Sequence, residues 1–178
     1  VASILNLSQD HLDRYGKFSD YLAAKQRIYD GCQVAVWNRD DLATRPQTQV
    51  PREITFGSHP EAHYQLDTDK QMLCHQGETL LHVDELALTG HHNAMNVLAV
   101  LAMADALGFD RATTLATVKR FKGLPHRCQL VAEDARIRWI NDSKATNVGA
   151  TLAALTGIGE AIEGRVILIA GGQGKGQD

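Results

Sequence analysis

The sequence has few cysteines, no long apolar stretch and no excess of basic residues, and each shortage excludes a class of protein. Its three cysteines, Cys32, Cys74 and Cys128, lie far apart and form no CxxC pair. Such sparse cysteines fit a reducing compartment, so we expect the protein in the cytoplasm. No apolar run is long enough to span a membrane, and the formal net charge is -3. We therefore expect neither a membrane protein nor one whose main partner is a nucleic acid.

What the sequence does contain is ordinary for a soluble globular protein, with 44% hydrophobic and 22% charged residues in a chain of 178. The sequence begins and ends within segments that are typical of the inside of a domain. The chain opens inside an apolar run without an initiator methionine, and it closes on a glycine-rich segment directly after the apolar run 166–170. A buried parallel strand needs neighbouring strands, so we expect a fragment of a longer enzyme.

Strand and helix patterns alternate along the first part of the chain. An apolar run at 3–7 predicts a strand, helical apolar spacing at 18–29 predicts a helix, and 33–38 predicts a second strand. This order indicates an α/β fold with a parallel sheet. Between 52 and 88, short β-type runs separated by glycine and aspartate predict a small, mostly antiparallel sheet inserted in or beside the parallel one. Two helices are expected next, over about 90–107 and 110–121.

A connector rich in turn residues, 123–128, marks the predicted boundary between two domains. Strand-like runs at 129–132 and 136–140, a helix from 148 and a strand at 165–170 follow it. This order indicates the start of a second α/β domain. We predict a first domain over residues 1–124 and a second over residues 125–178.

Three polar groups in the first domain are candidates for chemistry. Lys25 falls on the apolar face of the helix at 18–29. It either reaches water along a buried stem or is a desolvated amine with a lowered pKa. Asp10, His11 and Asp13 follow a strand end and can bind a metal or phosphate, or form a hydrogen-bonded loop. The last group is Asn93 and Asn96, whose amides, one helical turn apart, can bind a nucleobase or cap the helix.

The stretch 141–147, Asn-Asp-Ser-Lys-Ala-Thr-Asn, is the most polar strand-to-helix turn of the chain. Free backbone N–H groups at a helix start suit an anionic ligand, although a solvated turn with a helix cap is the alternative. Arg127 follows a proline turn and suits phosphate, unless the segment is a surface linker. The final glycine-rich segment fits neither GxxxxGK[ST] nor GxGxxG, but its Lys175 can meet a carboxylate.

Five segments, taken in order, resemble the Mur ligases of peptidoglycan synthesis. They are residues 4–15, 23–28, 90–96, 124–127 and 141–147. The last is the most specific, because sister ligases and folylpolyglutamate synthetases usually carry a Tyr-Ala-His or Tyr-Asn-Ala type of sequence there. The resemblance implies most of a P-loop-type central ATPase domain, truncated at its N-terminus and lacking its phosphate loop. The start of a Rossmann-like C-terminal domain would follow.

The resemblance also implies a reaction, a set of partners and roles for individual residues. It points to the family branch that joins D-glutamate to UDP-N-acetylmuramoyl-L-alanine through an acyl phosphate, using ATP and Mg²⁺ and releasing ADP. The parent enzyme would be a monomer, and this fragment alone would be inactive. The implied residues are His11 and a carbamylated Lys25 at magnesium, Asn93 and Asn96 at the nucleotide, Arg127 at the ATP phosphates, Asp142 at the ribose, and Lys144, Thr146 and Lys175 near D-glutamate and the transferred phosphate.

Three other functions stay open on the sequence. A related ligase of the same superfamily could take a different amino acid. The chain could also be a non-catalytic nucleotide-binding module. The third alternative is a metal-dependent hydrolase built on Asp10, His11 and Asp13.

Overall fold

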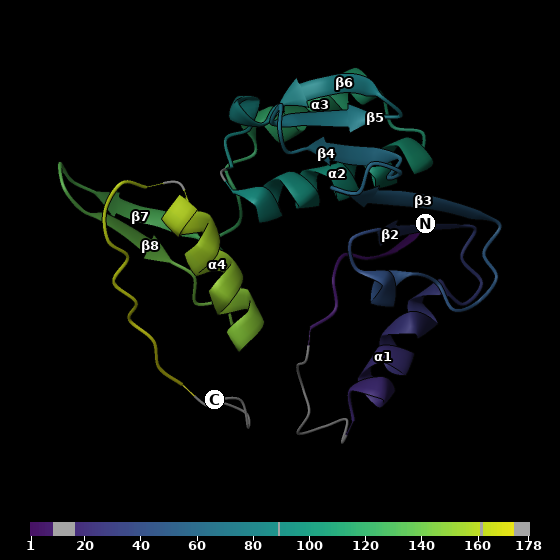
Figure 1. Cartoon of the computed structure of the whole chain (residues 1–178), viewed down its shortest axis with the longest axis horizontal. Helices are drawn as coiled ribbons and strands as arrows, with labels where there is room; N and C mark the ends of the chain where they lie inside the picture. The colour runs from purple at the N-terminus through teal and green to yellow at the C-terminus, as the bar shows by residue number, and fades with distance from the viewer. Residues whose placement is uncertain (9–16, 89, 161, 173–178) are drawn as a thin grey trace. The chain divides into compact units, whose positions relative to one another are not determined.

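The computed structural model describes residues 1–8, 17–88, 90–160 and 162–172 of the chain. These residues fall into two compact units, Val1–Phe121 and Lys122–Asp178 (Figure 1). Each unit has its own sheet, and helical elements accompany both sheets.

A six-stranded mixed sheet forms the centre of the first unit, with its strands side by side in sequence order (Figure 1). The first four strands pair in parallel, and the last two continue the sheet as antiparallel neighbours. The strands are β1 (Ala2–Ile4), β2 (Val34–Asn38), β3 (Arg52–Gly57), β4 (Tyr64–Asp67), β5 (Met72–His75) and β6 (Glu78–His82).

Helices cover both faces of this sheet, because neighbouring residues of β2 point to opposite sides. Val36 belongs to a buried cluster with residues of α2 (His91–Ala106), such as Leu98. Ala35 instead packs with Tyr29 from the short 3₁₀ turn η1 (Arg27–Tyr29), which directly follows α1 (Phe18–Gln26). The remaining helical elements are η2 (Leu42–Thr44), η3 (Val83–Glu85) and α3 (Arg111–Arg120).

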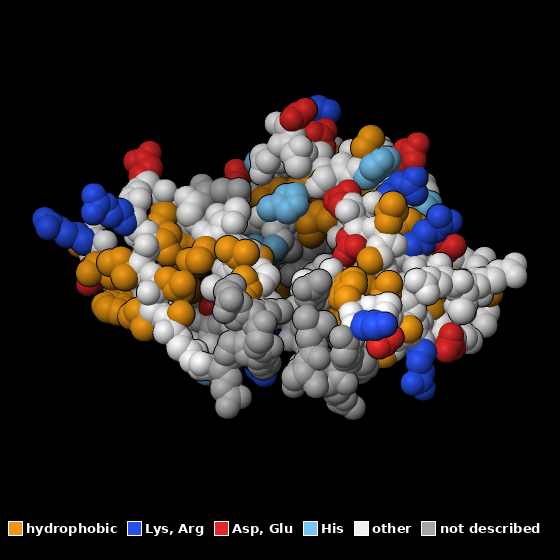
Figure 2. Space-filling view, turned by 60° about the horizontal axis from the view of Figure 1, so that its bottom comes forward, with side chains coloured by type: hydrophobic (Ala, Val, Ile, Leu, Met, Phe, Trp, Pro, Cys, Tyr) orange, Lys and Arg blue, Asp and Glu red, His pale blue; other side chains and the backbone are white. Residues whose placement is uncertain are grey.

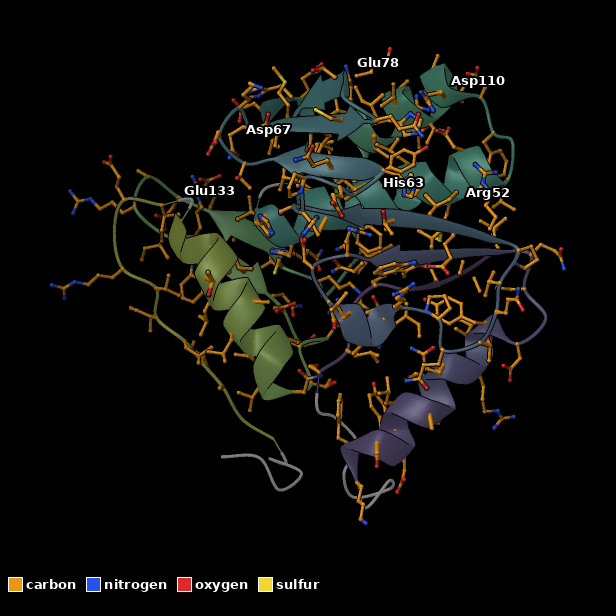
Figure 3. All side chains as sticks on the ribbon, turned by 45° about the vertical axis from the view of Figure 1, so that its right-hand side comes forward. Arg52, His63, Asp67, Glu78, Asp110 and Glu133 are labelled. Atoms are coloured by element: carbon orange, nitrogen blue, oxygen red, sulfur yellow. The ribbon has the colours of Figure 1, made fainter. Side chains whose placement is uncertain are left out.

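Local sequence signals explain where the two later helices of this unit begin and end. Gly108 follows α2 with φ of +77°, a conformation that favours glycine, and its N–H donates to the carbonyl of Asp105. Asp110, labelled in Figure 3, then caps α3 by accepting the N–H of Thr113 at 2.7 Å. The helices predicted over 90–107 and 110–121 are therefore confirmed.

Among its described residues, the second unit contains a two-stranded antiparallel sheet and one helix. The strands are β7 (Gln129–Glu133) and β8 (Arg138–Asn141), and the helix is α4 (Val148–Glu160). Asn147 caps α4, because its Oδ1 accepts the N–H of Ala150 at 2.8 Å. Many apolar side chains of this unit are exposed, including Trp139 at 50%, and Figure 2 shows hydrophobic side chains gathered over it at the left of the view.

The α/β fold class is confirmed, but two strand predictions were wrong in detail. The runs 54–56 and 63–66 are expected in the mostly antiparallel part. The first belongs to β3, which pairs in parallel with both of its neighbours, and the second belongs to β4, which pairs in parallel with β3 and antiparallel with β5. Only Phe56 and Gly57 of β3 pair with β4, so the short segment 58–63 suffices to join two parallel strands.

The second error concerns 166–170, which pairs with no strand among the residues that the structure describes. Ile167 and Ile169 are 86% and 84% exposed. The apolar pattern was read correctly, but a strand forms only where a neighbouring strand offers backbone partners.

Candidate functional site

The carboxyl edge of the parallel strands is the first candidate site. Ser58, just after β3, lies against Met95 in the first turns of α2, with Oγ 4.0 Å from Sδ. At the other end of α2, the carboxylate of Asp105 accepts a hydrogen bond from the hydroxyl of Tyr64, the first residue of β4. Helix α2 therefore runs opposite to the strands, and its N-terminus lies at their carboxyl edge. Ligands of open α/β sheets bind at this edge.

Asn93 and Asn96 lie in this N-terminal part of α2. Asn93 is half-buried and Asn96 is exposed. The N-cap position belongs to Gly90, whose carbonyl accepts the N–H of Asn93 at 3.0 Å. Neither asparagine is the N-cap residue of this helix. Both residues thus lie at the carboxyl edge of the sheet.

Asp40, which the sequence analysis did not single out, organises the same edge. Its carboxylate accepts the N–H groups of Ser58 at 2.6 Å and His59 at 2.9 Å. A Cβ on Gly57 would lie 2.9 Å from Oδ1 of Asp40, so this close approach requires glycine. Two adjacent aspartates, Asp40 and Asp41, one residue beyond the predicted strand 33–38, were the signal in the sequence that could have identified it.

Lys25 is exposed on α1, which fits the alternative of a side chain that reaches water and not that of a desolvated amine. The buried residues of this segment are Tyr21, Gln26 and Tyr29. The ammonium of Lys25 lies 5.3 Å from the ring centroid of Tyr21, in a cation–π arrangement. Gln26 takes the buried polar position because carbonyl groups of η2 and the following residue satisfy its amide, for example that of Ala43 at 2.8 Å.

The second candidate site is a hydrogen-bonded cluster in the second unit, formed by the connector 124–128 and the loop 141–147. Cys128 N–H donates to Oδ1 of Asp142 at 3.0 Å, and Lys144 N–H donates to the carbonyl of His126 at 3.1 Å. The side chains of Asn141 and His126 also meet, with Nδ2 and Nδ1 3.0 Å apart. We call this arrangement the connector cluster.

The hairpin explains why these two segments meet. β7 begins directly after the connector and β8 ends at the loop, and Gln129 pairs with Asn141 in the ladder. The cluster thereby brings together four residues singled out from the sequence, which are Arg127, Asp142, Lys144 and Thr146. Arg127, Lys144 and Thr146 are exposed and Asp142 is half-buried.

Backbone conformation and electrostatics also mark the connector as a built feature. His126 and Cys128 adopt φ of +65° and +44°, a region that side-chain-bearing residues rarely occupy. The hydrogen bonds to the loop hold them there. Burial, and then the nearby carboxylate of Asp142, raises the pKa of the Cys128 thiol above its usual value. The thiol therefore stays protonated at neutral pH.

Two predicted site residues, His11 and Lys175, lie outside the described residues, as do Asp10 and Asp13. Within the described ranges, no group of three His, Cys, Asp or Glu side chains is close enough to hold a metal ion. His63, labelled in Figure 3, shows the structural use of a histidine here, since its Nδ1 accepts the N–H of Thr55 at 3.0 Å. No described helix is both long and apolar enough to cross a membrane.

Comparison with known proteins places the chain in a family. The profile of the Mur ligase middle domain matches residues 1–104. The chain belongs to the Mur ligase family. It is 72% identical over 178 residues to the UDP-N-acetylmuramoylalanine--D-glutamate ligase of Alcanivorax borkumensis, and 46% identical over 179 residues to that of Vibrio parahaemolyticus. In both comparisons all of this chain matches 40% of the relative's length.

Solved structures support the same fold. The UDP-N-acetylmuramate-alanine ligase of Thermotoga maritima superposes with a TM-score of 0.68 at 27% identity, over 88% of this chain and 37% of that one. A pseudomurein peptide ligase of Methanothermus fervidus gives a TM-score of 0.69 at 19% identity, over 90% of this chain and 40% of that one. At that identity, the second likeness shows the fold alone.

Proposed function

We propose that this chain is part of an ATP-dependent ligase that joins D-glutamate to UDP-N-acetylmuramoyl-L-alanine and releases ADP. Residues 1–124 would be most of its central ATPase domain, and residues 125–178 the start of its C-terminal domain. The observation that carries the proposal is the connector cluster, which brings Arg127, Asp142 and Lys144 together on one hydrogen-bonded frame. Both relatives are D-glutamate ligases by name, which supports the choice of D-glutamate.

Four residues are proposed to contact the nucleotide. The amides of Asn93 and Asn96 suit a nucleobase, because each offers a donor and an acceptor. Arg127 suits the phosphates, because its guanidinium is always charged and donates in pairs. Asp142 suits a ribose hydroxyl, because the bond from Cys128 occupies only Oδ1 and a carboxylate has further acceptor sites.

The main chemical task of the enzyme is to neutralise the negative charge of the transferred phosphoryl group. The substrate carboxylate attacks the γ-phosphate, an acyl phosphate forms, and the amine of D-glutamate displaces phosphate. Fixed cations lower the barrier by neutralising charge that develops during the first step. Lys144, Thr146 and Lys175 are proposed to contact D-glutamate and the transferred phosphate.

Magnesium would supply further charge neutralisation when bound, and His11 and Lys25 are the residues proposed to hold it. Mg²⁺ prefers oxygen ligands, so the lysine would serve as a carbamate, formed when CO₂ adds to its neutral amine. We further propose that the enzyme works in the cytoplasm as a monomer, and that this chain alone is inactive.

The test is phosphate release by the full-length protein with Mg-ATP, UDP-N-acetylmuramoyl-L-alanine and a panel of D- and L-amino acids. Release that depends on D-glutamate is the expected result. Release with another amino acid would keep the reaction and replace the substrate. No release with any amino acid would favour a nucleotide-binding module, and metal-dependent ester cleavage by the isolated chain would favour a hydrolase.

A further inference from the structure

The turn after β2 holds the chain that leaves β1. The backbone ladder between these two strands ends at the pair Ile4 and Trp37. Beyond it, side chains continue the pairing. Asn38 donates from Nδ2 to the carbonyl of Leu5 at 3.1 Å, and Oδ2 of Asp41 accepts the N–H of Leu7 at 2.8 Å. The path of residues 5–7 is therefore fixed from β2, immediately before the segment that contains His11.

The same turn also holds the end of α1. Gln26 is 6% exposed, and its Nε2 donates to the carbonyl groups of Ala43 at 2.8 Å and Arg45 at 2.9 Å. Its Oε1 accepts the N–H of Gln47 at 3.2 Å. A buried amide with both ends satisfied fixes one orientation of the helix, whereas an apolar side chain would only fill the space. Lys25 is the residue directly before this anchor.

Tyr29 connects the two anchors to each other. Its hydroxyl accepts the N–H of Ile4 at 3.1 Å and donates to the carbonyl of Thr44 at 2.8 Å. The residue is 1% exposed, and burial raises the pKa of its hydroxyl to about 12. One turn, residues 38–47, thus fixes the exit from β1 and the end of α1 at the same time.

We propose that Asn38, Asp41 and Gln26 are positioning residues for the ligase reaction. They set the relative placement of the backbone that leads to His11 and of the helical turn that carries Lys25. This inference rests on the proposed function, which assigns both of those residues to the reacting centre. Displacing a reacting group by about 1 Å can cost roughly 100-fold in rate, so a shared anchor for both has a clear use.

The test compares variants of the full-length enzyme that grade the loss of these bonds. Asp41→Ala removes two acceptor oxygens. Oδ2 accepts the N–H of Leu7, and Oδ1 accepts the N–H of Ala43 at 3.2 Å. Asp41→Asn retains one acceptor oxygen. Gln26→Leu keeps the volume and loses all three bonds. Asp69→Asn is the matched control, an exposed carboxylate between β4 and β5.

The expected result is a graded loss of kcat, about 10-fold or more in Asp41→Ala and Gln26→Leu and less in Asp41→Asn. The KM values for ATP and D-glutamate should change by less than about twofold, since substrate contacts are untouched. Hydrogen exchange at the Leu7 amide should speed up in Asp41→Ala, and the control should behave as wild type.

Two results would overturn the inference. One is wild-type kcat in folded Asp41→Ala and Gln26→Leu enzymes, and the other is a loss confined to KM. If Asp41→Ala does not fold, Asp41→Asn decides in the same way. A wild-type enzyme without D-glutamate-dependent release would instead remove the proposed function, and this inference with it.

Discussion

The backbone N–H of Cys128 donates a hydrogen bond to Oδ1 of Asp142 across 3.0 Å. This bond joins the connector to the loop that precedes α4. A second bond joins the same two segments, from Lys144 N–H to the carbonyl of His126, so both sequence neighbours of Arg127 are bonded to the loop. Asp142 therefore has a structural use as well as the proposed contact with the nucleotide. The two roles can be separated by experiment.

Asp142→Asn should lower the pKa of the Cys128 thiol without returning it to its usual value. Burial is the largest cause of the raised pKa and persists in the variant, whereas the negative charge is lost. The measurement is the pH dependence of the rate at which a thiol reagent modifies Cys128. The Cys128→Ser variant shows which part of the measured modification comes from Cys128 and which from Cys32 and Cys74. An unchanged pH profile would show that Asp142 does not act on this thiol.

Arg111→Ala should destabilise the first unit by about 1–3 kcal/mol near pH 7, because Asp105 loses a charged partner 3.1 Å from Nε. Burial by itself would raise the pKa of Asp105, but the hydrogen bonds from Arg111 and Tyr64 outweigh it and hold the pKa below its usual value. The folded state thus favours the charged carboxylate. Its contribution is complete above the unfolded pKa of about 3.9 and disappears as the pH falls through the folded value.

Urea unfolding at several pH values measures this effect, with Trp37 fluorescence reporting on the first unit in a Trp139→Phe background. The difference between wild type and Arg111→Ala should shrink as the pH falls below about 4. Arg136→Ala, in the second unit, is the control and should leave the Trp37 transition in place. A difference that stays constant down to pH 2 would contradict the assignment.

Leu98→Ala should cost about 2–5 kcal/mol of unfolding free energy. Leu98 is fully buried in the cluster between α2 and the sheet. Leu107→Ala makes the same chemical change at a position that is 60% exposed, and it should cost about 0.5 kcal/mol or less. Urea unfolding followed at Trp37 compares them. Equal costs would mean that the described packing of α2 on the sheet is incorrect.

Lys25→Ala should leave the unfolding free energy within about 1 kcal/mol of wild type, since the side chain is exposed and loses only its cation–π contact with Tyr21. Under the proposed function, the full-length variant should lose phosphate release, and bicarbonate or short-chain acids should partly restore it. Release equal to that of wild type would exclude the proposed role of the lysine.

The helices were predictable because their signals are local. Gly108 and Asp110 determine the end of α2 and the start of α3 from within one or two turns of chain. Tyr21 and Tyr29 were expected on the buried side of the helix predicted at 18–29, but the burial of Gln26 was not predictable in this way. It depends on Gln26 meeting backbone groups of residues 43–47, which lie about twenty positions away and carry no side-chain signal.

The distinction between local and distant signals also applies to the connector cluster. The polar residues of the loop 141–147 were visible in the sequence, but their contact with the connector depends on the register of β7 and β8. The sequence does not state that register. Strand direction was missed for a similar reason, since a short β-type run looks the same in a parallel and an antiparallel pair.

The most direct test of the account is a chimera of the Alcanivorax borkumensis relative, in which this chain replaces the matching segment of the relative. The two segments are 72% identical. Phosphate release with Mg-ATP, UDP-N-acetylmuramoyl-L-alanine and either D- or L-glutamate would then be measured in the chimera and in the relative. The account predicts release that depends on D-glutamate, at a rate within about tenfold of the relative's. A folded chimera that binds ATP but releases no phosphate with D-glutamate would contradict it.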